Sequence, residues 1–144
     1  MKFTDGFWRV RPGVDARYAQ EAYDIAAEGD TLVVHAPTKV IERRGDVLNR
    51  TLLSVTLSSP LEGVVGVRVD HHQGTPRDGG FDLVGAVEGV AEARLDREDG
   101  VLTSGPLSAR VTHGAPWNLT FEADGRTLTS SGHKSIGYMQ LGAG

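Results

Sequence analysis

Residues 104–128 read SGPLSARVTHGAPWNLTFEADGRTL, and this stretch decides the fold class. Apolar and polar residues alternate in two runs, Leu107–Val111 and Trp117–Phe121. Turn residues follow each run, His113–Pro116 after the first and Asp124-Gly125 after the second. Alternation at period two places the apolar side chains on one face of a strand, and Asp-Gly is a strong hairpin signal. The stretch therefore predicts half-buried antiparallel strands.

Similar short runs occur along the rest of the chain, at the spacing of about 8–12 residues that is typical of β-sandwiches and barrels. The expected strands are Phe7–Val10, Tyr18–Ala27, Leu32–Ala36, Leu53–Ser58, Val65–Asp70, Val90–Arg97, Val101–Ser104 and Ser135–Leu141. The turn before Val101 is placed at Asp99-Gly100. We predict an all-β fold, an antiparallel β-sandwich.

The segment around Tyr18–Ala27 also permits a helix. Asp15 is a suitable N-cap and Gly29 a suitable stop. The apolar residues that would share a helical face are Ala16, Ala19, Tyr23 and Ala26. We favour the strand, because Leu32–Ala36 needs a neighbour and the turn at residues 28–30 supplies one.

The composition excludes several classes of protein. The 144 residues suit a single domain, and the absence of cysteine excludes disulfides and thiolate chemistry. A net charge of −4 without a basic patch argues against nucleic acid or an anionic membrane as a partner. The first 13 residues lack the apolar run of a signal peptide, so we expect a cytoplasmic location.

Three stretches together resemble the N-terminal domain of glycoside hydrolase family 31, especially its α-xylosidases. They are Met1–Gly13, Gly63–Gly74 (GVVGVRVDHHQG) and Leu102–Tyr138, and their order and spacing match across the whole chain. The resemblance implies a galactose-mutarotase-like β-sandwich that precedes a catalytic (β/α)8 barrel. It also implies a retaining mechanism with two aspartates on that barrel.

The resemblance implies that residues 1–144 are a single N-terminal β-sandwich domain. It also implies that this chain lacks the barrel and stops before the sandwich is complete. No catalytic residue of the family falls on any position here, so we expect the chain to be inactive by itself. We assign no catalytic, cofactor-binding or metal-binding residue and expect no cofactor. The implied partner is the barrel of the same parent chain, which would meet the carbohydrate substrate. An open sheet edge would also favour a homo-oligomer.

Several local clusters have a possible chemical role and a simpler structural one. Asp70-His71-His72 offers metal-ligand types, but adjacent residues of a strand point in opposite directions and no second cluster is near. Ser130–His133 (SSGH) lacks the spacing of a catalytic triad, and Gly63–Gly66 lacks the lysine of a phosphate loop. In each case we favour the structural interpretation.

The aromatic and acidic residues are weighed in the same way. Trp8 and Trp117 are candidate sugar platforms, but Trp117 is in phase with Leu119 and Phe121 and is expected in the core, with a partner for its indole N–H. The acidic candidates Glu42, Asp46, Asp96, Glu98 and Asp99 lie on turns or beside basic residues. Solvated turn charges are the favoured interpretation. The alternative functions are a carbohydrate-binding module and a free-standing β-sandwich for protein association.

Overall fold

The computed structural model describes residues 10, 12–48, 50–71 and 91–142. These residues form antiparallel strands and one short 3-10 helix, η1 (Arg44–Val47). The strands are β1 (Val14–Tyr18), β2 (Asp24–Glu28), β3 (Thr31–Pro37), β4 (Leu52–Ser58), β5 (Gly66–Asp70), β6 (Glu92–Asp96), β7 (Asp99–Ser104), β8 (Leu107–Val111), β9 (Leu119–Ala123), β10 (Arg126–Ser131) and β11 (Gly137–Leu141). The expected strand at residues 7–10 lies outside the described residues except for Val10.

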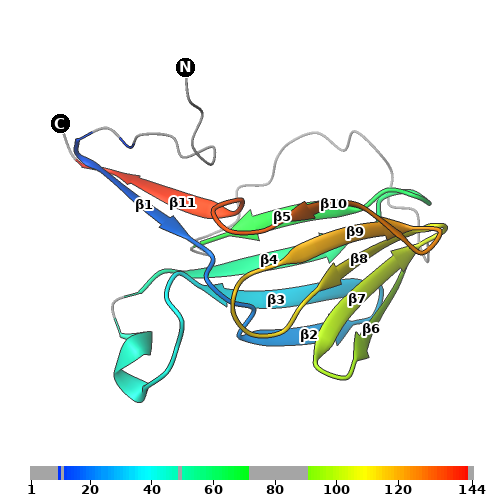
Figure 1. Ribbon diagram of the computed structural model, residues 1–144, viewed down its shortest axis with the longest axis horizontal. Helices are drawn as coiled ribbons and strands as arrows, with labels where there is room; N and C mark the ends of the chain where they lie inside the picture. Colours follow the sequence, from blue (N-terminus) through cyan, green and yellow to red (C-terminus); the bar gives the residue numbers. More distant parts are fainter. Residues whose placement is uncertain (1–9, 11, 49, 72–90, 143–144) are drawn as a thin grey trace.

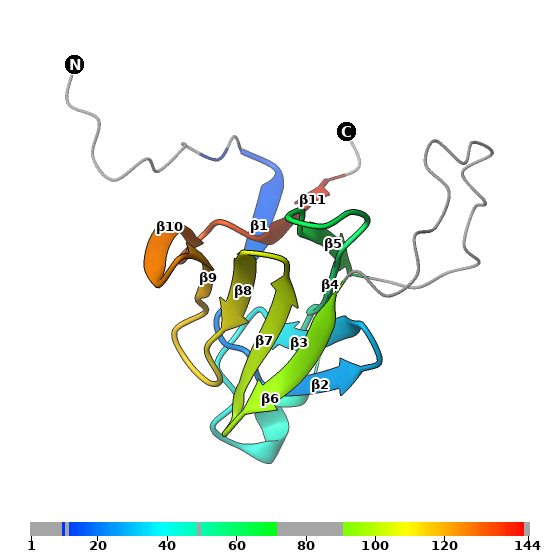
Figure 2. The same ribbon diagram turned by 90° about the vertical axis from the view of Figure 1, so that its right-hand side faces the viewer.

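The strands form two facing layers and a separate two-stranded ribbon (Figure 1). One layer is a four-stranded sheet in the order β2-β3-β4-β5, and the other is a five-stranded sheet in the order β10-β9-β8-β7-β6. Figure 2 shows β2 and β3 packed against β6 and β7. The ribbon pairs β1 with β11 and extends from one end of the sandwich. The predicted antiparallel β-sandwich is confirmed.

The core lies between the two layers and consists of alternate residues from each strand. Its fully buried members include Leu32, Val34, Leu53, Val55, Leu57, Leu102, Ala109, Val111, Trp117 and Leu119. The apolar residues at 107, 109 and 111 point inward, as the alternation in residues 104–128 predicts, and Trp117 is 1% exposed. Removal of this apolar surface from water is the main force that holds the sheets together.

The Asp124-Gly125 hairpin is confirmed. Both residues have positive φ angles, 52° and 70°, in the turn that joins β9 to β10. Two consecutive residues of positive φ match the right-handed twist of paired strands, which is why this dipeptide is favoured there.

The expected strand at Tyr18–Ala27 is wrong in its extent, and the helical alternative is also wrong. Tyr18 ends β1 and Asp24 begins β2, so two strands share the segment. Between them the backbone N–H of Ala19 donates to the carbonyl of Ile136 at 3.0 Å, and Ala22 forms an isolated bridge with Gly114. These long-range bonds turn the chain from the ribbon into the sandwich. The hairpin between β2 and β3 is confirmed.

The turn expected at Asp99-Gly100 lies instead at residues 97–98, since Asp96 pairs with Asp99. Gly100 is an inward-facing residue of β7. A Cβ atom added to it would lie 2.6 Å from Cγ2 of Ile25 and 2.7 Å from Cδ2 of Leu32. The absence of a side chain at Gly100 therefore allows the two sheets to approach closely, and this glycine does not form a turn.

Candidate functional site

A cleft of about 700 Å³ opens at one end of the sandwich. Its walls come from the start of β2, the end of β3, the η1 segment and the loop between β8 and β9. The lining includes Glu21, Tyr23, Asp24, His35, Arg50 and Leu52. A concave site of this size, apolar with a few polar groups, is the usual form of a small-ligand site.

Glu21 is the buried acidic residue of the cleft, with 7% of its surface exposed. Its Oε1 accepts a hydrogen bond of 2.7 Å from the backbone N–H of Ile41, which connects the η1 segment to the sandwich. Within the described residues, Oε2 accepts no hydrogen bond, and it is not among the fully buried unpartnered atoms. This second oxygen therefore remains open to the solvent of the cleft.

His35 lies on the outer face of β3, opposite Asp24 on β2 and Ser54 on β4. His35 lines the cleft, and its Nδ1 is buried, with no hydrogen-bond partner among the described residues. A buried polar atom without a partner is unfavourable by about 1–3 kcal/mol. Because Nδ1 of His35 is buried, the hydrogen-bonding capacity that these two residues leave open to the cleft is that of Oε2 of Glu21.

Asp46 shapes the wall that η1 contributes. Its Oδ2 accepts hydrogen bonds from the backbone N–H groups of Glu42 (3.2 Å) and Arg43 (2.9 Å), and its Oδ1 pairs with Lys39. The hydrogen bond from Lys39 and those from the backbone hold the pKa of Asp46 below its usual range. Asp46 is thus an ionised structural group that orders this segment.

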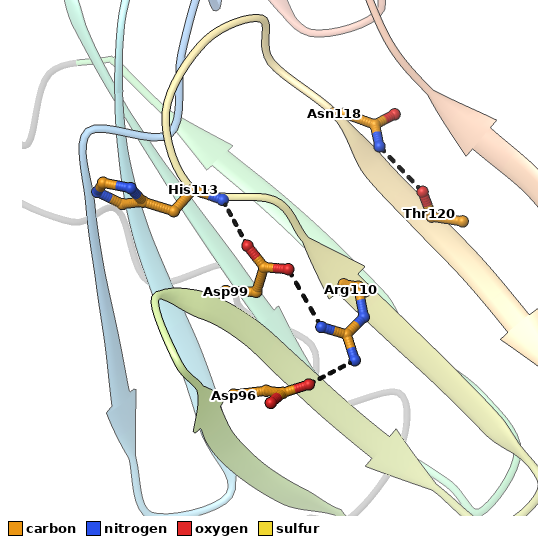
Figure 3. A network of polar contacts seen from close by, with 6 residues as sticks. All are labelled: Asp96, Asp99, Arg110, His113, Asn118 and Thr120. Atoms are coloured by element: carbon orange, nitrogen blue, oxygen red, sulfur yellow. Dashed lines mark hydrogen bonds and ion pairs between the residues drawn. The ribbon is translucent and has the colours of Figure 1, made fainter.

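A polar network on the five-stranded sheet supports the opposite wall (Figure 3). The guanidinium of Arg110 donates to Asp96 at 2.9 Å and to Asp99 at 3.1 Å. The hydrogen bond from Arg110 is the main reason why the pKa of Asp96 lies below its usual range, and the same bond raises the pKa of Arg110. A lowered pKa is the opposite of what a catalytic acid requires.

Asp99 extends this network to the cleft. Its Oδ1 accepts a hydrogen bond of 3.0 Å from the backbone N–H of His113, which lines the cleft, and Figure 3 shows Asp99 between His113 and Arg110. Nδ1 of His113 also lies 3.4 Å from Oε2 of Glu98. The three acidic candidates of this turn therefore come together around Arg110 and His113, in ion pairs and hydrogen bonds that fix the loop.

The side chains of Asp70 and His71 do not form a metal site, because each has a different structural partner. Asp70 pairs with Arg68 at 2.9 Å, and the ring of His71 stacks on Tyr138 at a centroid distance of 4.1 Å. His72 lies outside the described residues. Among the described residues no group of three or more His, Cys, Asp or Glu is placed to hold a metal ion.

The remaining candidates have structural surroundings. The N–H of Gly63 donates to Oγ of Ser104 at 3.0 Å, and Ser131 Oγ donates to Ser135 Oγ at 2.7 Å. Trp117 is buried, as expected, but the expectation of a partner for its indole N–H is wrong, because Nε1 has no partner within the part of the chain that the structure describes. Trp8 lies outside the described residues.

Sequence reasoning missed Glu21 and His35. Glu21 lies in the short crossing between β1 and β2, where no local pattern marks a buried acid. His35 lies at a polar position of an alternating strand, which predicts exposure. Only the fold of the η1 segment over the end of the sheet brings them into one cleft.

Among the described residues, no helical segment has the length and apolar character needed to cross a bilayer. The fold and the cleft define a β-sandwich domain with a mainly apolar cleft at one end, which a few polar groups line. No protein-family model matches the chain.

Two curated relatives match most of the chain. The α-xylosidase XylQ of Lactiplantibacillus pentosus is 32% identical over 131 residues, which cover 91% of this chain and 17% of XylQ. An α-xylosidase of Emericella nidulans is 31% identical over 96% of this chain and 19% of that enzyme. The chain is homologous to a segment of these two α-xylosidases, which supports its resemblance to the N-terminal domain of the α-xylosidases of glycoside hydrolase family 31. It spans less than one fifth of these relatives' length.

Solved structures show the same fold. The cycloalternan-forming enzyme of Listeria monocytogenes, solved with a pentasaccharide substrate, matches with a TM-score of 0.60 and 17% identity, over 88% of this chain and 11% of that chain. An uncharacterised protein of Listeria monocytogenes EGD-e matches with the same TM-score and 16% identity. At these identities the likeness concerns the fold alone.

Proposed function

We propose that the chain is the non-catalytic N-terminal β-sandwich domain of a retaining, α-xylosidase-like glycosidase. The parent enzyme releases terminal α-linked xylose, or glucose, from oligosaccharides. The observation that carries this proposal is the extent of the matches, which cover almost all of this chain but less than a fifth of each α-xylosidase. The other four fifths of such an enzyme provide the room for a catalytic (β/α)8 barrel.

In this proposal the domain buttresses the barrel and shapes its pocket. The described acidic side chains support a structural role, since Asp96 and Asp99 share one arginine and Asp46 orders a loop. Retaining glycosidases need a general acid with a raised pKa, about 5–5.5 Å from a carboxylate nucleophile. The lowered pKa values of Asp46 and Asp96 do not suit that role.

A segment exchange tests this proposal. In XylQ, the segment that matches this chain is replaced by residues 1–144 of this chain, and a second variant lacks the segment altogether. We expect the chimaera to hydrolyse p-nitrophenyl α-D-xyloside and the deletion variant to be insoluble or inactive. The isolated 144-residue chain should release no nitrophenol.

Two results would contradict the proposal. Hydrolysis of the xyloside by the isolated chain would show that the domain is catalytic. A soluble chimaera without activity, with an intact barrel by circular dichroism, would show that this chain does not replace the XylQ segment.

The same proposal includes a partner for the domain and a cellular compartment for the parent enzyme. The domain's main partner is the barrel of its own chain, and the cysteine-free composition suits the cytoplasm. A homo-oligomer is supported by β5, which is an edge strand of its sheet among the described residues and carries the exposed Val67 and Val69. Exposed apolar edges favour strand pairing between chains.

A further inference from the structure

We propose that the cleft between η1 and the β8–β9 loop binds a neutral carbohydrate, as a site separate from any catalytic pocket. The proposal rests on the proposed function for its sugar class, and on the cleft itself for its location. Trp117, a sequence-based candidate for sugar binding, lies in the core and not in this cleft.

The lining holds a hydrogen-bond acceptor without a partner. Oε2 of Glu21 accepts no hydrogen bond among the described residues, and it is not fully buried. Glu21 is 7% exposed, so its carboxylate is largely shielded from bulk water. A shielded carboxylate is stabilised by donors, and hydroxyl groups of a sugar are donors of suitable size.

Apolar surface lies beside the polar groups of the cleft. The lining also contains Tyr23, Val47 and Leu52, with exposed fractions of 51%, 53% and 45%. A sugar ring has apolar C–H faces and polar edges, so it packs on such side chains while its hydroxyls reach Glu21 and Asp24. An aromatic ring with a polar hydroxyl, as in Tyr23, suits this mixed surface.

The charge of the lining disfavours other ligands. The lining carries the carboxylates of Glu21, Asp24 and Asp46 and the guanidinium of Arg50. Because Lys39 pairs with Asp46, a net negative charge remains, and it would repel an anionic ligand such as a phosphate. A metal ion is also disfavoured, because no group of three ligating side chains converges among the described residues. A neutral polyhydroxylated molecule fits both the charge and the apolar surface.

A titration of the 144-residue chain tests this inference. The probe is α-D-xylosyl-(1→6)-D-glucose, with maltose and cellobiose for comparison, followed by calorimetry and by amide NMR shifts. We expect saturable binding of the xyloside with a dissociation constant on the order of 1 mM, typical of a few contacts in an open cleft. The shifted amides should include Tyr23, Arg50 and Gly114.

Two cleft variants and one control locate the binding. Glu21→Gln keeps an acceptor for the N–H of Ile41 but removes the charge, and we expect about tenfold weaker binding. Tyr23→Ala should weaken binding about fivefold through the lost packing surface. Glu28→Gln, at the far end of β2 and outside the cleft, should bind like the unmodified chain. Unchanged thermal unfolding of each variant confirms that the fold persists.

Each other result overturns the inference. The site would be excluded if no sugar bound at a concentration about 20-fold above the expected dissociation constant of about 1 mM. Amide NMR shifts confined to residues outside the cleft would also exclude it. Equal affinity in Glu21→Gln and Tyr23→Ala would do the same. Binding of n-butylammonium but of no sugar would show that the cleft receives a cationic side chain of a partner instead. The XylQ chimaera separates the two proposals, because it is expected to stay active even where Tyr23→Ala has weakened sugar binding in the cleft.

Discussion

Strands β4 and β5 lie side by side in one sheet and carry the same alternating pattern, but they are buried to different degrees. Val55 on β4 pairs with Val69 on β5, and both point to the inner face of the sheet. Val55 is fully buried, whereas Val69 is 39% exposed. β4 lies inside its sheet, while β5 forms the edge. Alternation thus reports the direction of a side chain, and the position of the strand decides how much covers it.

The largest expected effect distinguishes these two valines. Val55→Ala removes buried methyl groups and leaves a cavity, so the free energy of unfolding should fall by about 2 kcal/mol. Val69→Ala should lower it by well under about 1 kcal/mol, because that side chain already contacts water. Urea unfolding of both variants measures the difference. Equal losses would mean that the edge strand is as well covered as its neighbour.

A second prediction concerns the closest approach between the two sheets. Gly100→Ala places a Cβ atom within 3 Å of the side chains of Ile25 and Leu32, so we expect a loss of about 1–3 kcal/mol from overpacking. Gly45→Ala is the matched control, since an added Cβ meets nothing within 4 Å there. Thermal unfolding compares them, and an unchanged midpoint for Gly100→Ala would contradict the close packing.

A third prediction uses the exposed edge of β5. If β5 pairs with a second copy, the apparent mass in light scattering should rise with concentration, and Val69→Lys should return the chain to a monomer. Leu48→Lys, an exposed residue away from this edge, is the control. A monomer at all concentrations for the unmodified chain would exclude association through this edge.

The smallest effect concerns the charge network on the outer face of the five-stranded sheet. The folded-state pKa of Asp96 is lowered from 3.8, so its stabilising contribution is complete above that value and is lost as the pH falls through the folded-state pKa. Asp96→Asn should therefore lower the unfolding midpoint slightly at pH 7, and the difference should vanish in strong acid. Glu92→Gln, on the same strand, is the control. A difference that persists in strong acid would show that Arg110 is not its cause.

The sequence alone predicted the fold class and much of its local detail. The period-two pattern of residues 104–128 gave the inward direction of Leu107, Ala109 and Val111, and Asp124-Gly125 gave the hairpin. These features depend on side-chain periodicity and on backbone preferences of single residues, both of which are local. The resemblance to α-xylosidases was likewise carried by the order of the strands.

Only the tertiary structure decided the limits of the first strands, the role of Gly100 and the cleft. Ala19 and Ala22 bond to residues more than 90 positions away, and these bonds separate β1 from β2. Gly100 is of a residue type that is common in turns, but it faces Ile25 and Leu32 across the sandwich. Glu21 and His35 share a cleft because η1 folds over the sheet end. In each case the deciding contact joins distant parts of the chain, which no local pattern records.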